Sequence, residues 1–405
     1  MIPRTLETLL ETHHFSHRKM AFLAGPRQVG KTTLARGSLN AHGTPMLYYD
    51  WDDFRQRKRL LKDPYAFEQD VPVDARRPLV VFDEIHKYSQ WKNYLKGVFD
   101  RYGQAMDFLV TGSGRLNIYK RGADSLFGRF FMYNLLPLSL GEIEHHSIPP
   151  GATLFEEFSG PKRSQRDAYE SLLHCSGFPE PFLKASSSFL NRWENARKEL
   201  VLRQDIRDLT SVREIGSVEH LMLLLPEKIG APLSINSLCG DIGVSFKTIA
   251  HWMEILERVY YLFTVMPYAQ KISRSIKKER KVYFWNWVEV EDASRRFENF
   301  VACHLQKLVT MTNDFGLAKL ELRYCRDKDA REVDFLLLKE GKHWILVEAK
   351  MADSTPSPSL YRFMKALGLK KSFQVIDSPG AHFKRASPEG TVHVLSADIF
   401  LRDLP

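Results

Sequence analysis

The fold of this chain is decided by the stretch Ala21-Phe22-Leu23-Ala24-Gly25-Pro26-Arg27-Gln28-Val29-Gly30-Lys31-Thr32-Thr33-Leu34-Ala35. It predicts a short apolar strand, a loop bounded by glycines and the first turn of a helix. The phosphate-binding loop pattern G-x-x-x-x-G-K-[ST] is matched throughout by Gly25, Gly30, Lys31 and Thr32. Glycines let the backbone curl so that successive N–H groups point at a phosphate, and the helix directs its positive end at the same anion.

The loop predicts a binding site for ATP and Mg²⁺. Lys31 is placed to reach the β- and γ-phosphates, and the Thr32 hydroxyl is placed to ligate Mg²⁺. The alternative is a chance glycine turn, but chance rarely puts strand, loop and helix signals in this order. The predicted cofactor-binding residues are Gly25, Pro26, Arg27, Gln28, Val29, Gly30, Lys31, Thr32 and Thr33.

Four further apolar segments predict strands that alternate with helices. They lie at 46–51, 78–84, 107–113 and 131–135, and most of them end in polar residues. Continuous apolar runs of this kind are typical of strands buried on both faces of a parallel sheet. The sequence therefore predicts an α/β fold with ligands at the carboxyl edge of the sheet.

Two carboxylates end the second of these segments. We expect Asp83 to bind Mg²⁺ together with Thr32, and we expect Glu84 to orient the attacking water. The alternative is a pair of solvated carboxylates at a strand end. Ser113, with Thr111, ends the neighbouring strand and is predicted to sense the γ-phosphate, although a simple strand-end cap explains this pair as well.

Composition sets only broad limits. A length of 405 residues suggests two or three domains. The net charge of +9 fits an anionic partner such as nucleic acid, or simple solubility. The four cysteines are widely spaced, which favours a reduced, cytoplasmic setting. The N-terminus lacks a signal-peptide pattern, and no apolar run is long enough to span a bilayer, so we expect no membrane association.

Several motifs resemble those of prokaryotic AAA-type ATPases that carry a C-terminal domain of unknown function. The motifs are Asp83-Glu84-Ile85-His86-Lys87-Tyr88 with Trp91, Thr111-Gly112-Ser113, Leu126-Phe127-Gly128-Arg129, Leu136-Pro137-Leu138-Ser139, Gly177-Phe178-Pro179-Glu180, Leu202-Arg203-Gln204-Asp205-Ile206, Phe297-Glu298-Asn299-Phe300 and Glu332-Val333-Asp334-Phe335. The resemblance covers nearly the whole chain. It implies a homo-oligomer, a hexameric ring, in which Arg129 completes the ATP site of the neighbouring subunit.

The middle of the chain predicts a helix–turn–helix. Helical segments at 235–242 and 245–258 flank a turn at Gly243, and the segment 261–265 reads as a strand, so we expect a winged helix. In a DNA-binding version the second helix presents Lys247, Thr248 and His251 to the groove; the alternative is a packing module. A basic run suited to phosphate contacts, or simply a solvated loop, follows and contains Lys271, Arg274, Lys277, Lys278, Arg280 and Lys281.

The last hundred residues predict a second constellation. Strands at 333–338 and 344–350 are joined by a turn, and a hairpin centred on Gly341 puts Asp334 opposite Glu348, with Lys350 on the same face. This pattern resembles the restriction-endonuclease-like motif. The resemblance implies that Asp334 and Glu348, with Glu298 as an additional acid, hold Mg²⁺ and that Lys350 activates or positions a water. The alternative is a salt-bridged hairpin in a fold that has lost its activity.

These signals divide the chain into four parts. We expect a P-loop AAA-type ATPase core at 1–140, a helical subdomain at 141–216, a winged helix at 217–290 and a restriction-endonuclease-like domain at 291–405. The first hypothesis is an oligomeric ATPase that remodels DNA or translocates on it. The second is an ATP-gated, Mg²⁺-dependent DNA nuclease, and the third is a nucleotide-dependent switch that binds a protein.

Overall fold

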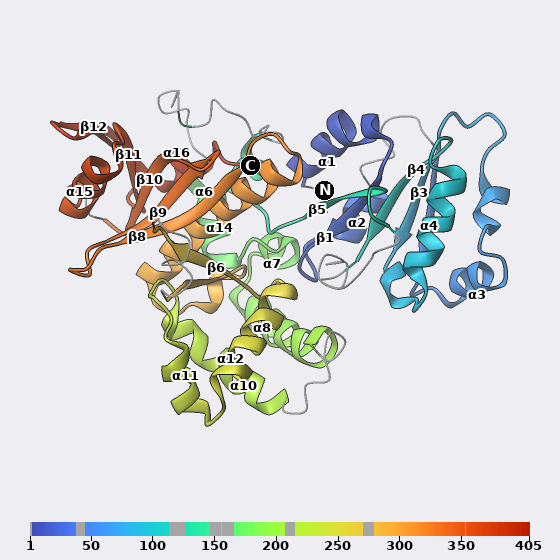
Figure 1. The fold of residues 1–405 in the computed structure, drawn as a ribbon, viewed down its shortest axis with the longest axis horizontal. Helices are drawn as coiled ribbons and strands as arrows, with labels where there is room; N and C mark the ends of the chain where they lie inside the picture. Colours follow the sequence, from blue (N-terminus) through green and yellow to red (C-terminus); the bar gives the residue numbers. More distant parts are fainter. Residues whose placement is uncertain are drawn as a thin grey trace. The chain divides into compact units, whose positions relative to one another are not determined.

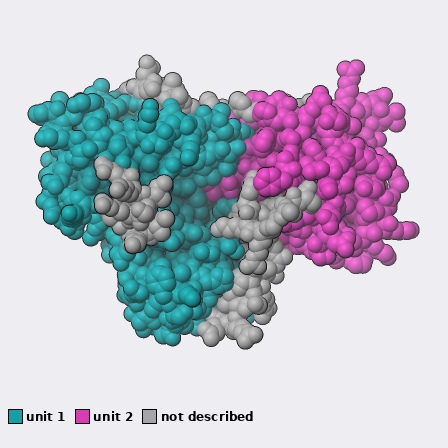
Figure 2. Space-filling model, viewed as in Figure 1, with its two compact units in different colours: residues 1–2, 137–405 teal, residues 3–136 magenta. Residues whose placement is uncertain are grey.

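The chain forms two compact units, each with its own sheet. The computed structural model describes residues 2–37, 45–112, 126–145, 155, 166–206, 215–269, 279–352 and 354–405. The N-terminal unit comprises residues 3–136, and the C-terminal unit comprises residues 137–405 with the first two residues (Figure 2). The helical, winged-helix and endonuclease-like parts expected from the sequence thus lie in a single compact unit.

The N-terminal unit is built on a five-stranded sheet in which every pair of neighbours is parallel (Figure 1). The strand order is β2-β3-β4-β1-β5. The strands are β1 (Met20–Ala24), β2 (Met46–Asp50), β3 (Leu79–Asp83), β4 (Asp107–Thr111) and β5 (Phe130–Asn134). The predicted α/β fold with a parallel sheet is therefore confirmed, and the carboxyl ends of β1 and β3 lie at one edge.

The helices of this unit are α1 (Thr5–Leu9), α2 (Lys31–Gly37), α3 (Phe54–Lys62) and α4 (Trp91–Tyr102). α1 continues as a π-type turn and then a 3₁₀ turn, which ends at the left-handed residue Arg18. Asp53 caps α3, since its carboxylate accepts from the N–H groups of Arg55 and Gln56.

The C-terminal unit contains a mixed sheet of eight strands in the order β12-β13-β11-β10-β9-β8-β6-β7. The central strands β8, β9 and β10 are antiparallel, whereas β10, β11 and β13 run parallel to one another. The strands are β6 (Leu262–Pro267), β7 (Lys281–Phe284), β8 (Leu320–Arg326), β9 (Glu332–Lys339), β10 (Lys342–Lys350), β11 (Lys371–Ile376), β12 (His382–Ser387) and β13 (Gly390–Ser396).

The helix–turn–helix is present, but its hairpin is part of this sheet. Gly243, with φ +78°, ends α11, and Ser245 caps α12. Strands β6 and β7 form an antiparallel pair, yet β6 also pairs with β8. The hairpin is therefore the edge of the eight-stranded sheet and not a free wing. The helices of this unit are α5 (Leu140–His145), α6 (Arg166–Cys175), α7 (Pro179–Lys184), α8 (Ser187–Leu200), α10 (Ile215–Leu224), α11 (Ile235–Ile242), α12 (Phe246–Arg258), α14 (Ala293–Asp314), α15 (Pro358–Leu367) and α16 (Ala397–Leu401).

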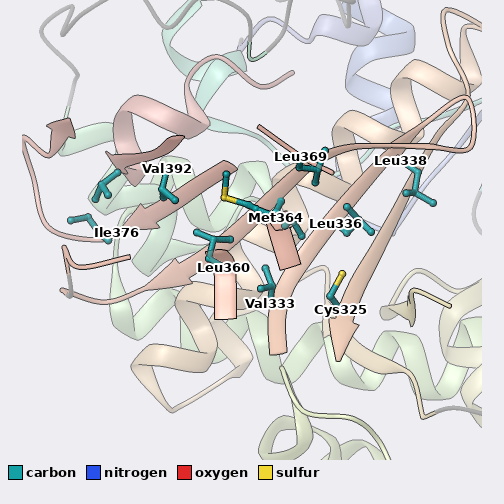
Figure 3. Packing of buried hydrophobic residues seen from close by; sticks show 11 residues of the cluster. Cys325, Val333, Leu336, Leu338, Leu360, Met364, Leu369, Ile376 and Val392 are labelled. Carbon is teal, nitrogen blue, oxygen red and sulfur yellow. The ribbon is translucent and has the colours of Figure 1, made fainter. Parts of the chain in front are cut away.

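Apolar packing fixes α15 against the C-terminal sheet. Leu360 and Met364 of α15 are fully buried among side chains that include Leu336 of β9 and Val392 of β13 (Figure 3). Burial of such side chains is the main favourable contribution to folding. In the part of the chain that the structure describes, no helix is both long enough and apolar enough to cross a membrane.

A buried ion pair ties the helices at 166–206 to the C-terminal unit. The guanidinium of Arg197 on α8 lies 3.1 Å from Glu289, and both side chains are almost completely shielded from solvent. The Tyr261 hydroxyl donates to the other oxygen of Glu289 at 2.6 Å. Buried charges are tolerated when they are paired in this way, which explains why these helices cluster with the C-terminal residues.

Candidate nucleotide-binding site

The backbone of the phosphate-binding loop takes conformations that only glycine adopts without strain. Gly25 has φ +149° and Gly30 has φ +101°. A Cβ atom on Gly25 would lie 2.2 Å from the carbonyl oxygen of Leu135, so a larger residue has no room there. The glycines are thus required by geometry, as the motif predicts.

Lys31 begins α2 and is held inside the loop. Its ammonium donates to the carbonyl oxygens of Gly25 at 2.9 Å and Pro26 at 2.7 Å. Arg4 stabilises the loop, because its guanidinium donates hydrogen bonds to the carbonyl oxygens of Val29 and Leu136. The loop and the cation that the motif assigns to phosphate binding are therefore positioned together.

The carboxylate of Asp83 connects the loop to three strands. It is almost fully buried at the end of β3 and accepts a hydrogen bond from the Thr32 hydroxyl at 2.8 Å. Thr111 at the end of β4 and Tyr48 on β2 donate to the same carboxylate. Thr32 and Asp83, which the sequence assigns to Mg²⁺, lie in contact.

The hydroxyl contacts of Asp83 were only partly foreseeable. The hydroxyl of Thr111, which the sequence predicts near the γ-phosphate, donates to Asp83. The contact from Tyr48 was missed, although the residue precedes the strand end of β2 by two positions and so points to the same face as Asp50. Ser113, predicted beside Thr111, lies outside the described residues.

Glu84 follows Asp83 in the left-handed conformation, with φ +56°. One of its carboxylate oxygens lies 3.4 Å from the ammonium of Lys87 and 3.7 Å from Nε2 of His86. Burial raises the pKa of Glu84, while the positive charges of Lys87 and Lys31 oppose the rise. The sequence pattern indicates no role for His86 or Lys87, since their contacts with Glu84 depend on the turn that follows β3.

These groups fit a magnesium nucleotide. Hydroxyl and carboxylate oxygens are hard ligands that suit Mg²⁺, and Thr32 and Asp83 supply one of each. A buried ammonium and a helix N-terminus face the position of the phosphates. The arrangement can therefore bind a phosphate chain with its metal, and it places a carboxylate beside it.

Arg129 lies at the other edge of the sheet from the loop of its own chain. It immediately precedes β5, and its carbonyl accepts from the N–H of Met20, at the start of β1. The loop follows the other end of β1, so the length of a five-residue strand, about 16 Å, separates the two. The guanidinium forms a two-point ion pair with Asp100 of α4, at 2.6 and 3.1 Å.

The hairpin of β9 and β10 brings Asp334 and Glu348 to adjacent positions through a bulge. Pairing shifts by one residue between His343 and Ile345, and Phe335 then pairs with Val347. At the next position the carboxylate of Asp334 accepts from the N–H of Ala349 at 3.0 Å. The negative charge of Asp334 adds to burial in raising the pKa of Glu348.

The lysine of the predicted motif lies beside its glutamate. The ammonium of Lys350 is 3.0 Å from Glu348, and the hydroxyl of Ser357, the N-cap of α15, donates to the other oxygen of the same carboxylate at 2.5 Å. Glu298 of α14 lies near Asp334, since the ammonium of Lys281 is 3.0 Å from the first carboxylate and 3.5 Å from the second. Burial and then the charge of Asp334 raise the pKa of Glu298 to about 7. The four polar residues predicted for this constellation thus gather in one region.

The prediction for Lys281 was wrong. The sequence placed it in an exposed basic run, but its ammonium is fully buried and lies 3.0 Å from Glu298, 2.6 Å from Glu332 and 3.5 Å from Asp334. Its neighbours in the run, Lys271, Arg274, Lys277 and Lys278, lie outside the described residues. Within the described part of the chain, no group of three or more Asp, Glu, His or Cys side chains is arranged to hold a metal.

On the second helix of the helix–turn–helix, Lys247 and His251 are exposed. Thr248 is partly buried, and its N–H and hydroxyl bond to the capping hydroxyl of Ser245. Two of the three residues predicted to face a groove are thus accessible, while the third belongs to the cap of α12.

Three family models match successive parts of the chain. Residues 17–144 match an AAA domain. Residues 166–287 match a domain of unknown function (DUF8612), and residues 294–394 match another domain of unknown function (DUF4143). The resemblance noted from the motifs is therefore confirmed.

Relatives and solved structures are distant. An uncharacterized protein of Mycobacterium tuberculosis is 22% identical over 399 residues, which cover 94% of this chain and 81% of that protein. An uncharacterized protein of Methanocaldococcus jannaschii is 20% identical over 292 residues, which cover 66% of this chain and 60% of that protein.

Two of the solved structures that this chain is similar to are from Thermotoga maritima and Aeropyrum pernix. The Thermotoga maritima RuvB Holliday junction branch migration motor is 17% identical, with a TM-score of 0.32, and the match covers 68% of this chain and 94% of that one. The Aeropyrum pernix ORC1 protein in complex with DNA is 12% identical, with a TM-score of 0.31, and the match covers 75% of this chain and 94% of that one. At these TM-scores neither likeness bears on what this chain does.

The contact between Lys87 and Glu84 predicts a change in pH dependence. In the role predicted for it, Glu84 must be ionised, and the positive charge of Lys87 lowers its pKa. Lys87→Ala removes that charge and raises the pKa further, so the acid limb of the ATP turnover profile should move to higher pH. Lys58→Ala, an exposed lysine on α3, serves as the control and should leave the profile in place. Coincident acid limbs for wild type and Lys87→Ala would contradict the assignment of Glu84.

Proposed function

We propose that this chain, whose N-terminal unit is an AAA-type P-loop domain, hydrolyses ATP with Mg²⁺ and works on DNA as an oligomer. The observation that carries the first part is the contact between Thr32 of the loop and Asp83 at the end of β3. It brings the two expected metal-binding oxygens together beside the buried ammonium of Lys31.

Each residue of the site has a distinct task in this proposal. Lys31 and the loop N–H groups bind the phosphates, and Thr32 and Asp83 would hold Mg²⁺, which supplies positive charge to the β- and γ-phosphate oxygens. Glu84 orients the attacking water and accepts its proton. The hydroxyls of Tyr48 and Thr111 hold the carboxylate of Asp83 in place.

Assembly into a ring is supported by the surroundings of Arg129. Arg129 lies at the edge away from its own loop, as an arginine that acts on the site of a neighbouring subunit would. Phe127 and Phe131, on either side of it, leave 74% and 41% of their surface exposed. Exposed aromatic side chains beside an arginine are typical of protein–protein contacts. In the proposed oligomer, Arg129 leaves Asp100 and approaches the phosphates of the neighbour.

DNA is the proposed partner of the C-terminal unit. The net charge of +9 and the exposed Lys247 and His251 on α12 support it. A second candidate is a nucleotide-dependent switch that binds a protein. The observation that favours it is that the β6–β7 hairpin pairs with β8 and so serves as a packing element of the sheet. The nuclease alternative requires Mg²⁺ between Asp334 and Glu348, each of which already has protein donors.

Two substitutions separate ATP binding from hydrolysis. Lys31→Ala should lose ATP affinity, because it removes the main cation on the phosphates. Glu84→Gln should retain ATP affinity and lose turnover by about 100-fold or more, because only the water-orienting group changes. Nucleotide titration and phosphate release measure the two effects. Full turnover in both variants would disprove the ATPase assignment.

Mixing experiments test the role of Arg129 between subunits. Arg129→Ala alone should bind ATP and lose turnover. Mixed with Glu84→Gln protein it should recover part of the activity, because a mixed ring can contain an intact Arg129 facing an intact Glu84. Arg101→Ala, which also breaks an exposed ion pair on α4, is the matched control and should stay active. An inactive mixture despite demonstrated subunit exchange would exclude action between subunits.

Salt dependence tests for DNA contacts. Neutralising Lys277, Lys278 and Arg280 while keeping the buried Lys281 should weaken DNA binding and reduce its salt slope by about 0.9 for each DNA phosphate that is no longer neutralised. A matched triple variant at exposed basic positions of α3, Arg55, Lys58 and Lys62, should change neither quantity. Binding isotherms at several salt concentrations measure both. If wild type binds no DNA, the protein-binding switch becomes the better account.

A further inference from the structure

A lysine contacts two of the carboxylates, Glu298 and Asp334, that the endonuclease-like motif assigns to a metal. The Lys281 ammonium contacts three carboxylates, at 2.6 Å from Glu332, 3.0 Å from Glu298 and 3.5 Å from Asp334. It is fully shielded from solvent at the start of β7, and these carboxylates are on α14 and β9. Burial opposes its charge, but the three carboxylates outweigh burial and raise the pKa of Lys281, so it stays protonated.

The second carboxylate oxygens of Asp334 and Glu332 already have donors. Asp334 accepts from Ala349 N–H at 3.0 Å with the oxygen that does not face Lys281. Glu332 binds Arg326 at 3.1 Å with its second oxygen. A carboxylate whose oxygens are engaged by protein donors must give up those bonds before it can enter a metal shell.

The glutamate of the motif is likewise satisfied. One oxygen of Glu348 lies 3.0 Å from the Lys350 ammonium, and the other accepts from the Ser357 hydroxyl at 2.5 Å. Asp334 and Glu348 therefore do not share one cation: each has a lysine of its own. The residues as arranged do not fit a divalent metal.

The cluster is also closed on one side. Gly230, in a left-handed turn with φ +75°, passes so close to Glu298 that a Cβ atom there would lie 2.9 Å from the carboxylate. The hydroxyl of Tyr283 donates to Glu298 at 2.7 Å from β7. Glu298 is thus contacted by the turn, by β7 and by Lys281, and the ammonium takes the position among the carboxylates that a metal would need.

We propose that Lys281 is the resident cation of this cluster and that the C-terminal domain binds no divalent metal there and does not cleave DNA. An ammonium tethered to β7 replaces the metal and neutralises the like charges of Glu298, Glu332 and Asp334. Its function is then to hold α14, β7 and β9 together, and the domain acts by binding. This inference does not depend on ATP hydrolysis.

Direct metal titration of the full chain tests the proposal. Mn²⁺ binding is measured without nucleotide for wild type and for Asp334→Asn, and the difference isolates the C-terminal cluster from the ATP site. The expected result is the same stoichiometry for both proteins, and no cutting of linear, circular or branched DNA in Mn²⁺. A site of about one equivalent that disappears in Asp334→Asn, or DNA cleavage that disappears with it, overturns the proposal.

Removing the lysine should create the metal site. Lys281→Met keeps a side chain of similar length without charge, and it should bind about one additional Mn²⁺ and melt at higher temperature with Mn²⁺ than with EDTA. Lys281→Arg, which keeps a cation, should show neither effect. A folded Lys281→Met protein that binds no additional Mn²⁺ and melts at the same temperature with Mn²⁺ as with EDTA overturns the proposal. If Lys281→Met folds only with Mn²⁺, that result supports it; if it does not fold at all, the comparison of wild type with Asp334→Asn decides.

Discussion

The carboxylate of Asp83 is the point on which the nucleotide site depends. Hydroxyls from the loop, from β2 and from β4 all donate to it, so one buried group fixes the positions of Thr32, Tyr48 and Thr111. A buried carboxylate is stable only when its oxygens are satisfied. The order of the sheet, with β3 between β2 and β4, supplies donors on both sides. The loop, held by Gly25 and Lys31, completes the site.

The buried carboxylates of the C-terminal unit also need donors for their oxygens, but the donors differ from those of Asp83. Lysines supply the positive charge: Lys281 contacts Glu298, Glu332 and Asp334, and Lys350 contacts Glu348. The hydroxyls of Tyr283 and Ser357 are additional donors. Apolar packing of α15 on the sheet supplies stability around this region. Acidic residues that are assembled for a metal and acidic residues that are assembled around an ammonium look alike in a sequence, because both need only carboxylates at a fixed spacing.

Sequence reasoning succeeded where the information is local. The loop was predictable because the conformations of Gly25 and Gly30 and the start of α2 follow from adjacent residues. Contacts between distant segments were not predictable in this way. Lys281 is 17 residues from Glu298 and 53 from Asp334 along the chain, and its burial depends on where β7 joins the sheet.

The hairpin register shows the same limit on a smaller scale. We expected Asp334 opposite Glu348 from a hairpin centred on Gly341. The turn alone would displace the pairing by one residue, since Lys339 pairs with Lys342, and the bulge before Ile345 restores it. The expected neighbours were found, but for a reason that the sequence pattern does not contain. The Asp100 partner of Arg129 was likewise hidden, because it comes from a separate helix.

Phosphate release from ATP by Asp83→Asn tests the central claim most directly, since the substitution preserves shape and removes the charge that would hold Mg²⁺. The matched control is Asp107→Asn, which removes a carboxylate at the start of β4, at the edge of the sheet away from the loop, where it pairs with Arg77. The account predicts that Asp83→Asn folds and loses turnover by about 100-fold or more, while Asp107→Asn remains active. A folded Asp83→Asn protein with wild-type turnover would contradict it.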